Sequence, residues 1–264
     1  MKTMKKIFAL LLALAVLMSM TACGSKPETE LSDTEYVKSK GKLVVGITDF
    51  APMDYQENGE WIGFDADMAK AFAESLGVTA EFVVIDWDLK ASELDNKSID
   101  CVWNGMTLTD GVKAAMSTSN PYCNNAQVVV VSADIAENYT TEASLGDLNF
   151  AVEAGSAGQS VAAEKGLTAT PVADQATALL EVASGTCDAA IIDLLMAGAM
   201  IGEGTSYENL TYTVKLNSEE YGVGFRKGSD LTEKLNEFFA ISYAEGTMME
   251  IANIYGVQES IIGQ

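Results

Sequence analysis

The strongest constraint on the fold is an alternation of strand-like and helix-like runs that begins near residue 41 and starts again near residue 149. The first series reads KLVVGITD, GFDADMAKAFAESLG, TAEFVVID, a helix over about 88–97, and IDCVWNGM. The second reads NFAVEAG, GQSVAAEKG, TATPVAD, QATALLEVASG and CDAAIID. Strands that alternate with helices pair in parallel through right-handed crossovers. Because the order restarts, we predict an α/β protein with two βαβαβ lobes.

Two extended stretches are predicted to connect these lobes. The apolar run 128–131 follows the first series, and residues 218–221 follow the second. Lobe 1 would then comprise 41–127 and 222–264, and lobe 2 would comprise 132–217. Two strand crossovers form a hinge, and open α/β sheets bind ligands in the crevice at the carboxyl ends of their strands. The sequence therefore predicts a ligand cleft between two hinged lobes.

The amino-terminal segment has the pattern of a signal peptide over residues 1–22. Three lysines precede Ile7–Met18, a run of twelve apolar residues, which is shorter than the roughly 20 that span a bilayer. The following Met-Thr-Ala-Cys resembles the lipobox of bacterial lipoproteins, in which cleavage before the cysteine leaves Cys23 to be acylated. We therefore expect residues 23–40 to be a lipidated cysteine and a polar tether, with a short helix at its end as an option, and the protein to be lipid-anchored on the extracytoplasmic side of the cell membrane. Secretion after cleavage near Ala22 is the alternative.

Composition excludes several classes of function. The formal net charge is −22, which repels nucleic acids. The absence of histidine excludes a Ser-His-Asp triad, a histidine base and histidine-ligated metals. Besides Cys23, the chain has Cys101, Cys123 and Cys187; we expect buried thiols, with a Cys101–Cys123 disulfide left open. No cysteine spacing predicts a metal site, and no cofactor is expected.

Residues 41–256 resemble the extracellular solute-binding proteins of family 3, which serve polar amino-acid ABC importers. The motifs that carry this resemblance are GKLVVGITDFAPM, WIGFDADMAKAFAESLG, KSIDCVWNGMTLTD, SNPYCNNAQVVVV, SGTCDAAIID and YGVGFRKGSDLTEKLNEFF. The resemblance implies a two-lobed periplasmic-binding-protein-like fold of type II. It also implies a monomer that captures an amino acid or amine and delivers it to an ABC permease and ATPase complex.

The resemblance also implies which residues hold the two ends of an amino acid. An acidic residue at the end of DAAIID, Asp193, would bind the ammonium; capping the next helix, LLMAGAM, is its alternative role. The GSAG loop, through Ser156 and Ala157, would bind the carboxylate with backbone amides at a helix start. The arginine that usually clamps this carboxylate falls on Val112, so the clamp is missing. The single arginine, Arg226, matches an exposed position outside the pocket.

The remaining contacts implied by the resemblance come from the first series. Phe50 and Trp87 would cover the ligand from opposite sides, and the strand end would offer polar contacts. Aromatic faces and Asp193 without an arginine favour a ligand whose recognised charge is positive. The predicted contacts of this wall are Asp49, Phe50, Trp87, Asn104, Gly105, Thr107 and Val112.

Two other functions were weighed against transport. A ligand-sensing surface module would have the same anchor and cleft. A cyclohexadienyl-dehydratase-like enzyme would need a general acid or base, for which Asp193 or Glu93 is available. With no histidine and no evident carboxylate pair, we expect a binding protein and not an enzyme.

Overall fold

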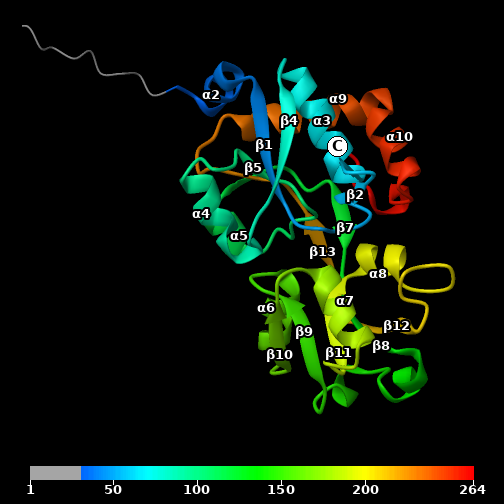
Figure 1. Ribbon diagram of the computed structural model, residues 1–264. Coiled ribbons are helices and arrows are strands. Elements are labelled where there is room, and N and C mark those ends of the chain that lie inside the picture. The colour runs from blue at the N-terminus through cyan, green and yellow to red at the C-terminus, as the bar shows by residue number, and fades with distance from the viewer. Residues whose placement is uncertain (1–30) are drawn as a thin grey trace, which may run out of the picture. The chain divides into compact units, whose positions relative to one another are not determined.

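The computed structural model describes residues 31–264, in which each predicted lobe contains its own five-stranded sheet (Figure 1). The predicted signal peptide, residues 1–22, and Cys23 lie outside the described residues. Among the helices of residues 31–264, none is long and apolar enough to cross a membrane. Residues 32–264 group together as one unit.

The sheet of lobe 1 has the strand order β4-β1-β5-β14-β6. Strand β1 pairs in parallel with β4 and β5, and the central strand β5 is followed by β14, which runs antiparallel to its neighbours. The strands are β1 (Lys42–Ile47), β4 (Thr79–Val84), β5 (Cys101–Val102), β6 (Ser117–Thr118) and β14 (Gly224–Phe225), with a hairpin of β2 (Tyr55–Glu57) and β3 (Glu60–Ile62). The helices are α2 (Asp33–Lys40), α3 (Phe64–Ser75), α4 (Lys90–Asp95), α5 (Asp110–Ala115), α9 (Leu231–Glu245) and α10 (Thr247–Ile254), with short 3₁₀ turns η1 (Trp87–Leu89) and η4 (Gln258–Ser260).

The sheet of lobe 2 repeats this plan in the order β10-β9-β11-β8-β12. Strand β9 pairs in parallel with β10 and β11, and β8 runs antiparallel between β11 and β12. The two βαβαβ series of the sequence analysis are thus confirmed. The elements are β8 (Gln127–Ser132), β9 (Asn149–Glu153), β10 (Thr168–Val172), β11 (Ala189–Asp193), β12 (Leu210–Lys215), α6 (Ala157–Glu164), α7 (Gln175–Ala183), α8 (Leu194–Met200), η2 (Ala133–Asn138) and η3 (Glu142–Ser144).

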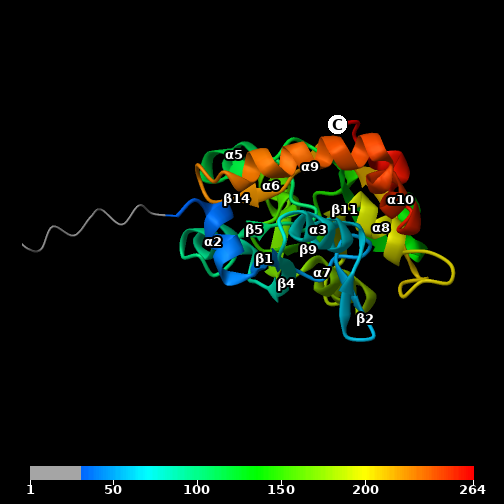
Figure 2. The same ribbon diagram turned by 90° about the horizontal axis from the view of Figure 1, so that it is seen from above.

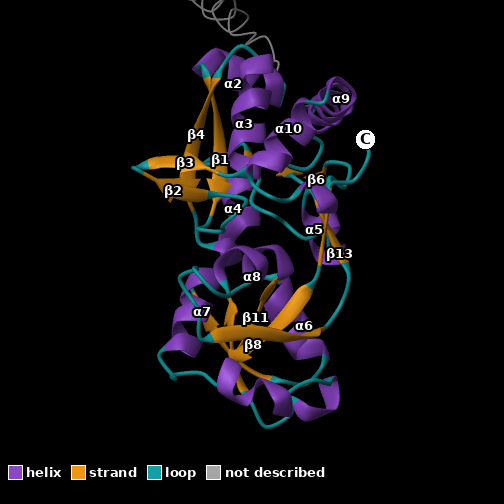
Figure 3. Ribbon diagram, turned by 90° about the vertical axis from the view of Figure 1, so that its right-hand side faces the viewer, coloured by secondary structure: helices purple, strands orange, loops and turns teal. Residues whose placement is uncertain are grey.

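The chain passes between the lobes as a two-stranded antiparallel sheet, which we name the crossing pair: β7 (Cys123–Asn125) and β13 (Glu219–Tyr221). Figure 3 shows β13 between the two sheets and β8 inside the sheet of lobe 2. The run 128–131, predicted as the first crossing, thus lies within the sheet of lobe 2, and the predicted second crossing 218–221 overlaps β13. The valines at 128–131 are buried on both faces of the sheet, as expected of an apolar run without alternation.

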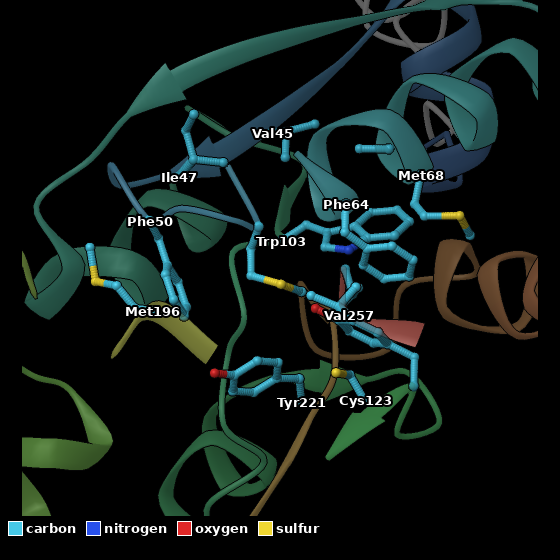
Figure 4. Packing of buried hydrophobic residues seen from close by; sticks show 14 of the residues in the cluster. Val45, Ile47, Phe50, Phe64, Met68, Trp103, Cys123, Met196, Tyr221 and Val257 are labelled. Atoms are coloured by element: carbon cyan, nitrogen blue, oxygen red, sulfur yellow. The ribbon is translucent and has the colours of Figure 1, made fainter. Parts of the chain in front are cut away.

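The carboxy-terminal helices return to lobe 1. Helix α9 ends at Gly246, whose φ of 89° provides the left-handed cap, and α10 follows directly. Both helices pack against α3 (Figure 2). In the core beside them, Trp103 is fully buried (Figure 4), and its ring meets that of Phe239 edge-on. Trp103 therefore belongs to the core and not to the cleft.

The last residues of the predicted tether form the short helix α2, which the sequence analysis left as an option, and this helix is held on lobe 1. Ser32 and Glu35 form a capping box at the start of α2, a pair that satisfies two free helix amides. Arg226 Nη2 lies 2.8 Å from Asp33 Oδ1, and Lys40 Nζ lies 2.6 Å from Asp100 Oδ2. Arg226 is buried, so its predicted exposure is wrong: its guanidinium attaches α2 to the lobe.

The three described cysteines are free thiols. Cys101, Cys123 and Cys187 are all buried. Burial raises the pKa of the Cys101 thiol well above its usual range. Packing, and not a Cys101–Cys123 disulfide, accounts for these residues.

Candidate functional site

A cavity of about 50 Å³ lies between the two sheets and is lined by residues of both lobes. It contains nine of the ten predicted contacts. The tenth, Asp49, is exposed beside the cavity and does not line it. Lobe 1 contributes Phe50, Trp87, Lys90, Asn104, Gly105, Met106, Thr107, Thr109 and Val112, and lobe 2 contributes Glu153, Gly155, Ser156, Ala157, Ser160, Gln175 and Asp193.

Buried carboxylates of lobe 1 support the turn that carries Asn104 and Gly105. Asn104 Nδ2 donates to Asp54 Oδ2 at 2.8 Å, and Gly105 N donates to Asp65 Oδ2 at 2.6 Å. Gly105 has a φ of 53°, and a Cβ there would overlap the ring of Phe50. Glycine is therefore required for the aromatic ring to lie flat against the turn.

Two aromatic side chains bound the cavity in lobe 1. Phe50 is buried and meets the ring of Tyr221 edge-on, with 6.3 Å between centroids. Trp87 is also buried, and Lys90 Nζ lies 4.8 Å from its ring centroid. Such an arrangement stabilises a cation over an aromatic face. Both rings thus lie where the sequence predicts ligand-covering side chains.

The two lobes touch at the GSAG loop. Lys90 Nζ donates to the carbonyl oxygen of Gly155 at 2.9 Å across the cleft. Gly155 has a φ of 68°, and a Cβ there would lie 2.7 Å from Cα of Asp88. Behind it, Ser156 Oγ caps α6 by accepting from Gln159 N at 3.1 Å. The first amides of α6 come from Ala157 and Gly158, and they point along the positive end of the helix dipole.

Asp193 lies at the end of β11 inside a dense hydrogen-bond network. Its Oδ1 accepts from Gln127 Nε2 at 2.7 Å and Gln175 Nε2 at 3.1 Å. Its Oδ2 accepts from Asn125 Nδ2 at 2.9 Å and from the hydroxyl of Tyr221. The side chain makes no capping bond to α8, so the alternative role as a helix cap is wrong. Burial, with the nearby charge of Glu219, raises the pKa of Asp193 to about 7.

The network around Asp193 continues into the crossing pair through Glu219. Glu219 Oε1 accepts from Asn125 Nδ2 at 2.7 Å and from Gln127 Nε2 at 2.8 Å. It also accepts from Thr107 Oγ1 at 2.9 Å, which attaches a predicted contact of lobe 1 to the same carboxylate. The cavity and the strands between the lobes therefore share side chains.

Sequence reasoning missed Glu153, a second buried carboxylate in the cavity. It closes β9 and is 3% exposed, and its Oε1 has no hydrogen-bond partner within residues 31–264. Burial and the charge of Asp193 raise its pKa to about 8, against a hydrogen bond with Thr48 and the charge of Lys90. The signal was present, because Glu153 ends an apolar strand as Asp193 does.

The other candidates lie as follows. Val112 lines the cavity at the position expected for the missing arginine, while Lys113 is exposed. Glu93 is half-buried and is not among the lining residues. In the part of the chain that the structure describes, no cluster of acidic or cysteine side chains has the arrangement of a metal site.

Comparisons with known proteins bear on the family and on the two-lobed fold. The profile of the bacterial extracellular solute-binding proteins, family 3, matches residues 43–258. The arginine-binding extracellular protein ArtP of Bacillus subtilis is 30% identical over 244 residues, which cover 89% of this chain and 91% of that protein.

Two solved structures share the fold. The substrate-binding protein of an ABC uptake transporter from Streptococcus pneumoniae, solved with bound histidine, has a TM-score of 0.77 and 29% identity, covering 85% of this chain and 96% of that one. The ancestral amino-acid-binding protein AncCDT-1, a precursor of cyclohexadienyl dehydratase, also has a TM-score of 0.77 and 29% identity, covering 85% and 99%. Both support the two-lobed architecture.

Proposed function

This chain belongs to the bacterial extracellular solute-binding proteins of family 3, and on that basis we propose that it captures a positively charged amino acid or related amine and delivers it to an ABC importer. One observation carries the charge preference: the cavity is lined by two buried acidic side chains, Asp193 and Glu153, against a single lysine, Lys90, and no arginine. The relatives that bind arginine and histidine support an amino acid as the ligand class.

In this proposal the ligand lies between the rings of Phe50 and Trp87. Its ammonium approaches the Asp193 side of the cavity, where buried acceptors and Gln175 surround it. A carboxylate, where present, accepts from the first amides of α6, at Ala157. Neither contact alone replaces the two hydrogen bonds that an arginine would donate to a carboxylate. Ligands with a strong positive charge should therefore bind with the highest affinity.

Capture is proposed to proceed by hinge closure at the crossing pair. The bond from Lys90 to Gly155 joins the lobes on one side of the cavity, and the bonds of Glu219 support the crossing strands on the other. A cleft closed over a ligand excludes water and strengthens charge pairing. Small-angle scattering should show compaction on ligand addition, and an unchanged envelope in a binding-competent sample would argue against closure.

The membrane attachment is proposed to depend on acylated Cys23. The family is extracellular, and a lipid anchor would keep the protein beside its permease and ATPase complex on the outer face of the cell membrane. Mass spectrometry of the processed protein tests this, because the Cys23→Ala variant should lose the lipid and leave the membrane. A wild-type amino terminus that begins elsewhere would end the proposal. We also expect a monomer, which sedimentation checks.

Binding, and not catalysis, is the function that the family supports. The cavity does bring two carboxylates together, contrary to the sequence expectation of no such pair, and one structural neighbour precedes a dehydratase. A ligand recovered chemically unchanged after incubation with the protein supports binding. Turnover of a cyclic acid would replace this proposal with an enzyme.

The decisive experiment is a thermal-shift panel of amino acids, amines, betaines and amino-acid derivatives. A ligand at a hundred times its Kd stabilises a protein by about 2.7 kcal/mol. We expect compounds with a positive group to give the largest shifts. Strong stabilisation by glutamate, with none by cationic compounds, would overturn the proposed charge preference. A neighbouring permease gene would separate transport from ligand sensing.

A further inference from the structure

We propose that the carboxylate of Glu153 holds a second cationic group of the ligand, so that the cleft selects ligands with two cationic nitrogen atoms over those with one. This inference rests on the proposed function and adds a specificity-determining residue to it. It concerns a side chain that the resemblance did not assign.

The position of Glu153 supports this role. It lies at the carboxyl end of β9, where its lobe faces the cavity, and it lines that cavity. Only 3% of Glu153 is exposed, yet no group within residues 31–264 donates a hydrogen bond to its Oε1. A buried carboxylate oxygen without a donor is energetically costly unless a partner is supplied. A cationic ligand group would be that partner.

The two carboxylates of the cavity differ in how many acceptor sites they have left. Asp193 accepts four hydrogen bonds from protein side chains, two at each oxygen. A carboxylate has about four lone-pair sites in total, and protein groups occupy those of Asp193, so Asp193 attracts a nearby ammonium through its charge and not through a free lone pair. Glu153 has one whole oxygen left, which makes it the more open of the two acceptors for a ligand N–H.

No cationic side chain among residues 31–264 donates a hydrogen bond to the free oxygen of Glu153. Lys90 is the lysine of the cavity, but its ammonium donates to the carbonyl oxygens of Trp87 and Gly155 at 3.0 and 2.9 Å. The other charged groups that act on Glu153 are Asp193 and Asp174, both acidic. Thr48, which directly follows β1, contributes a neutral hydroxyl group that hydrogen-bonds to Glu153. Apart from Lys90, whose charge also acts on Glu153, the charged groups around Glu153 are therefore negative and favour a ligand cation.

The raised pKa of Glu153 predicts that ligand binding is coupled to the release of a proton. Its pKa of about 8 means that the side chain is mainly protonated near pH 7 without ligand. A cation bound at Oε1 favours the ionised form. Binding of such a ligand near pH 7 should therefore release a proton from Glu153, and affinity should rise as the pH approaches 8. Asp193 also titrates near this range, so the comparison must be made between variants.

The test uses pairs of ligands that differ by one cationic group. Calorimetry would compare L-arginine with L-citrulline and L-lysine with L-norleucine, on wild-type protein and on Glu153→Gln. We expect the wild type to prefer the cationic member of each pair, and Glu153→Gln to weaken that member by about 10- to 100-fold, the size of a lost charged hydrogen bond. The neutral members should change by less than about threefold. Repeating the titrations in two buffers of different ionisation enthalpy measures proton release.

Glu164→Gln is the matched control. Glu164 is exposed on the same lobe, at the end of α6, so this variant removes the same charge without removing a cavity contact. It should bind both members of each pair as the wild type does. Gln is nearly isosteric with Glu, and ligand-free unfolding checks that Glu153→Gln is folded.

Each outcome decides one question. Selective loss of the cationic members in Glu153→Gln, together with reduced proton release, supports the inference. Equal loss of both members would make Glu153 a residue of cleft closure and overturn it. Equal wild-type affinity within each pair would overturn it together with the proposed preference for positive charge, while capture of an amino acid for an importer would stand. Failure of the wild type to bind any amino acid or amine would overturn the proposed function as well.

Discussion

Replacing Glu153 by glutamine should stabilise the ligand-free protein, and more so at high pH. The ordinary pKa of 4.5 rises to about 8 in the fold, a difference of about 5 kcal/mol between protonated and ionised side chain. Because the folded pKa is the higher one, the folded state binds more protons than the unfolded state between these two values. The loss of folding stability caused by ionising the buried Glu153 is absent below about pH 4.5 and complete above about pH 8. Glutamine has no such penalty.

The assay is urea denaturation of both proteins, freed of ligand by refolding, near pH 5 and near pH 8. Over this interval the glutamate should lower the wild-type free energy of unfolding by about 3 kcal/mol. The advantage of Glu153→Gln should therefore grow by about the same amount. Asp65, whose pKa is raised to about 7, titrates in both proteins, so its contribution cancels. A variant that is less stable than wild type, by an equal amount at both pH values, would show that Glu153 has a favourable partner and would refute the argument.

Three further predictions concern the cavity. Gly155→Ala should weaken binding by about tenfold or more, because its Cβ meets Asp88 when the lobes are in contact; Gly166→Ala, with a similar φ of 67° and open space around it, is the control, and calorimetry in which both variants bind alike would contradict this. Asp193→Asn should lower the affinity, and should lower the free energy of unfolding by about 1–3 kcal/mol, since an amide group would face four donors. An unchanged urea midpoint would show that the hydrogen bonds of Asp193 do not stabilise the fold. Val112→Arg should improve ordinary α-amino acids in the thermal-shift panel by adding a carboxylate clamp, and a variant with no gain for any of them would show that this position does not reach the carboxylate.

The sequence predicts the architecture well because the architecture depends on periodicity. Alternation of strands and helices, repeated twice, determines the parallel strands of both mixed sheets. The crossing was misplaced because an apolar run such as 128–131 has no signature of which lobe buries it. Its valines pair with β11, a long-range contact that a local pattern does not contain. The polar residues of β7, which do cross, have weak strand propensity.

Side-chain roles were predicted less completely than backbone positions. Nine contacts reach the cavity because strand ends of parallel sheets converge at one edge. Glu153 was missed although it occupies the same kind of position as Asp193, since no motif drew attention to it. Arg226 was placed on the surface, but Asp33 and Asp100 lie far from it in sequence and bury it by charge pairing. Long-range partners of this kind decide burial, and a single sequence does not display them.

The side chains shared by the cavity and the crossing pair constrain how this protein can diverge. Asn125 and Gln127 each donate to both Asp193 and Glu219, so a substitution at that end alters the connection between the lobes as well as the ligand contacts. Glu153 and Val112 line the cavity but do not take part in this shared network. A lineage that changes its nutrient would therefore accumulate replacements at these two positions, while the amide-rich end stays constant and preserves the motion on which uptake depends.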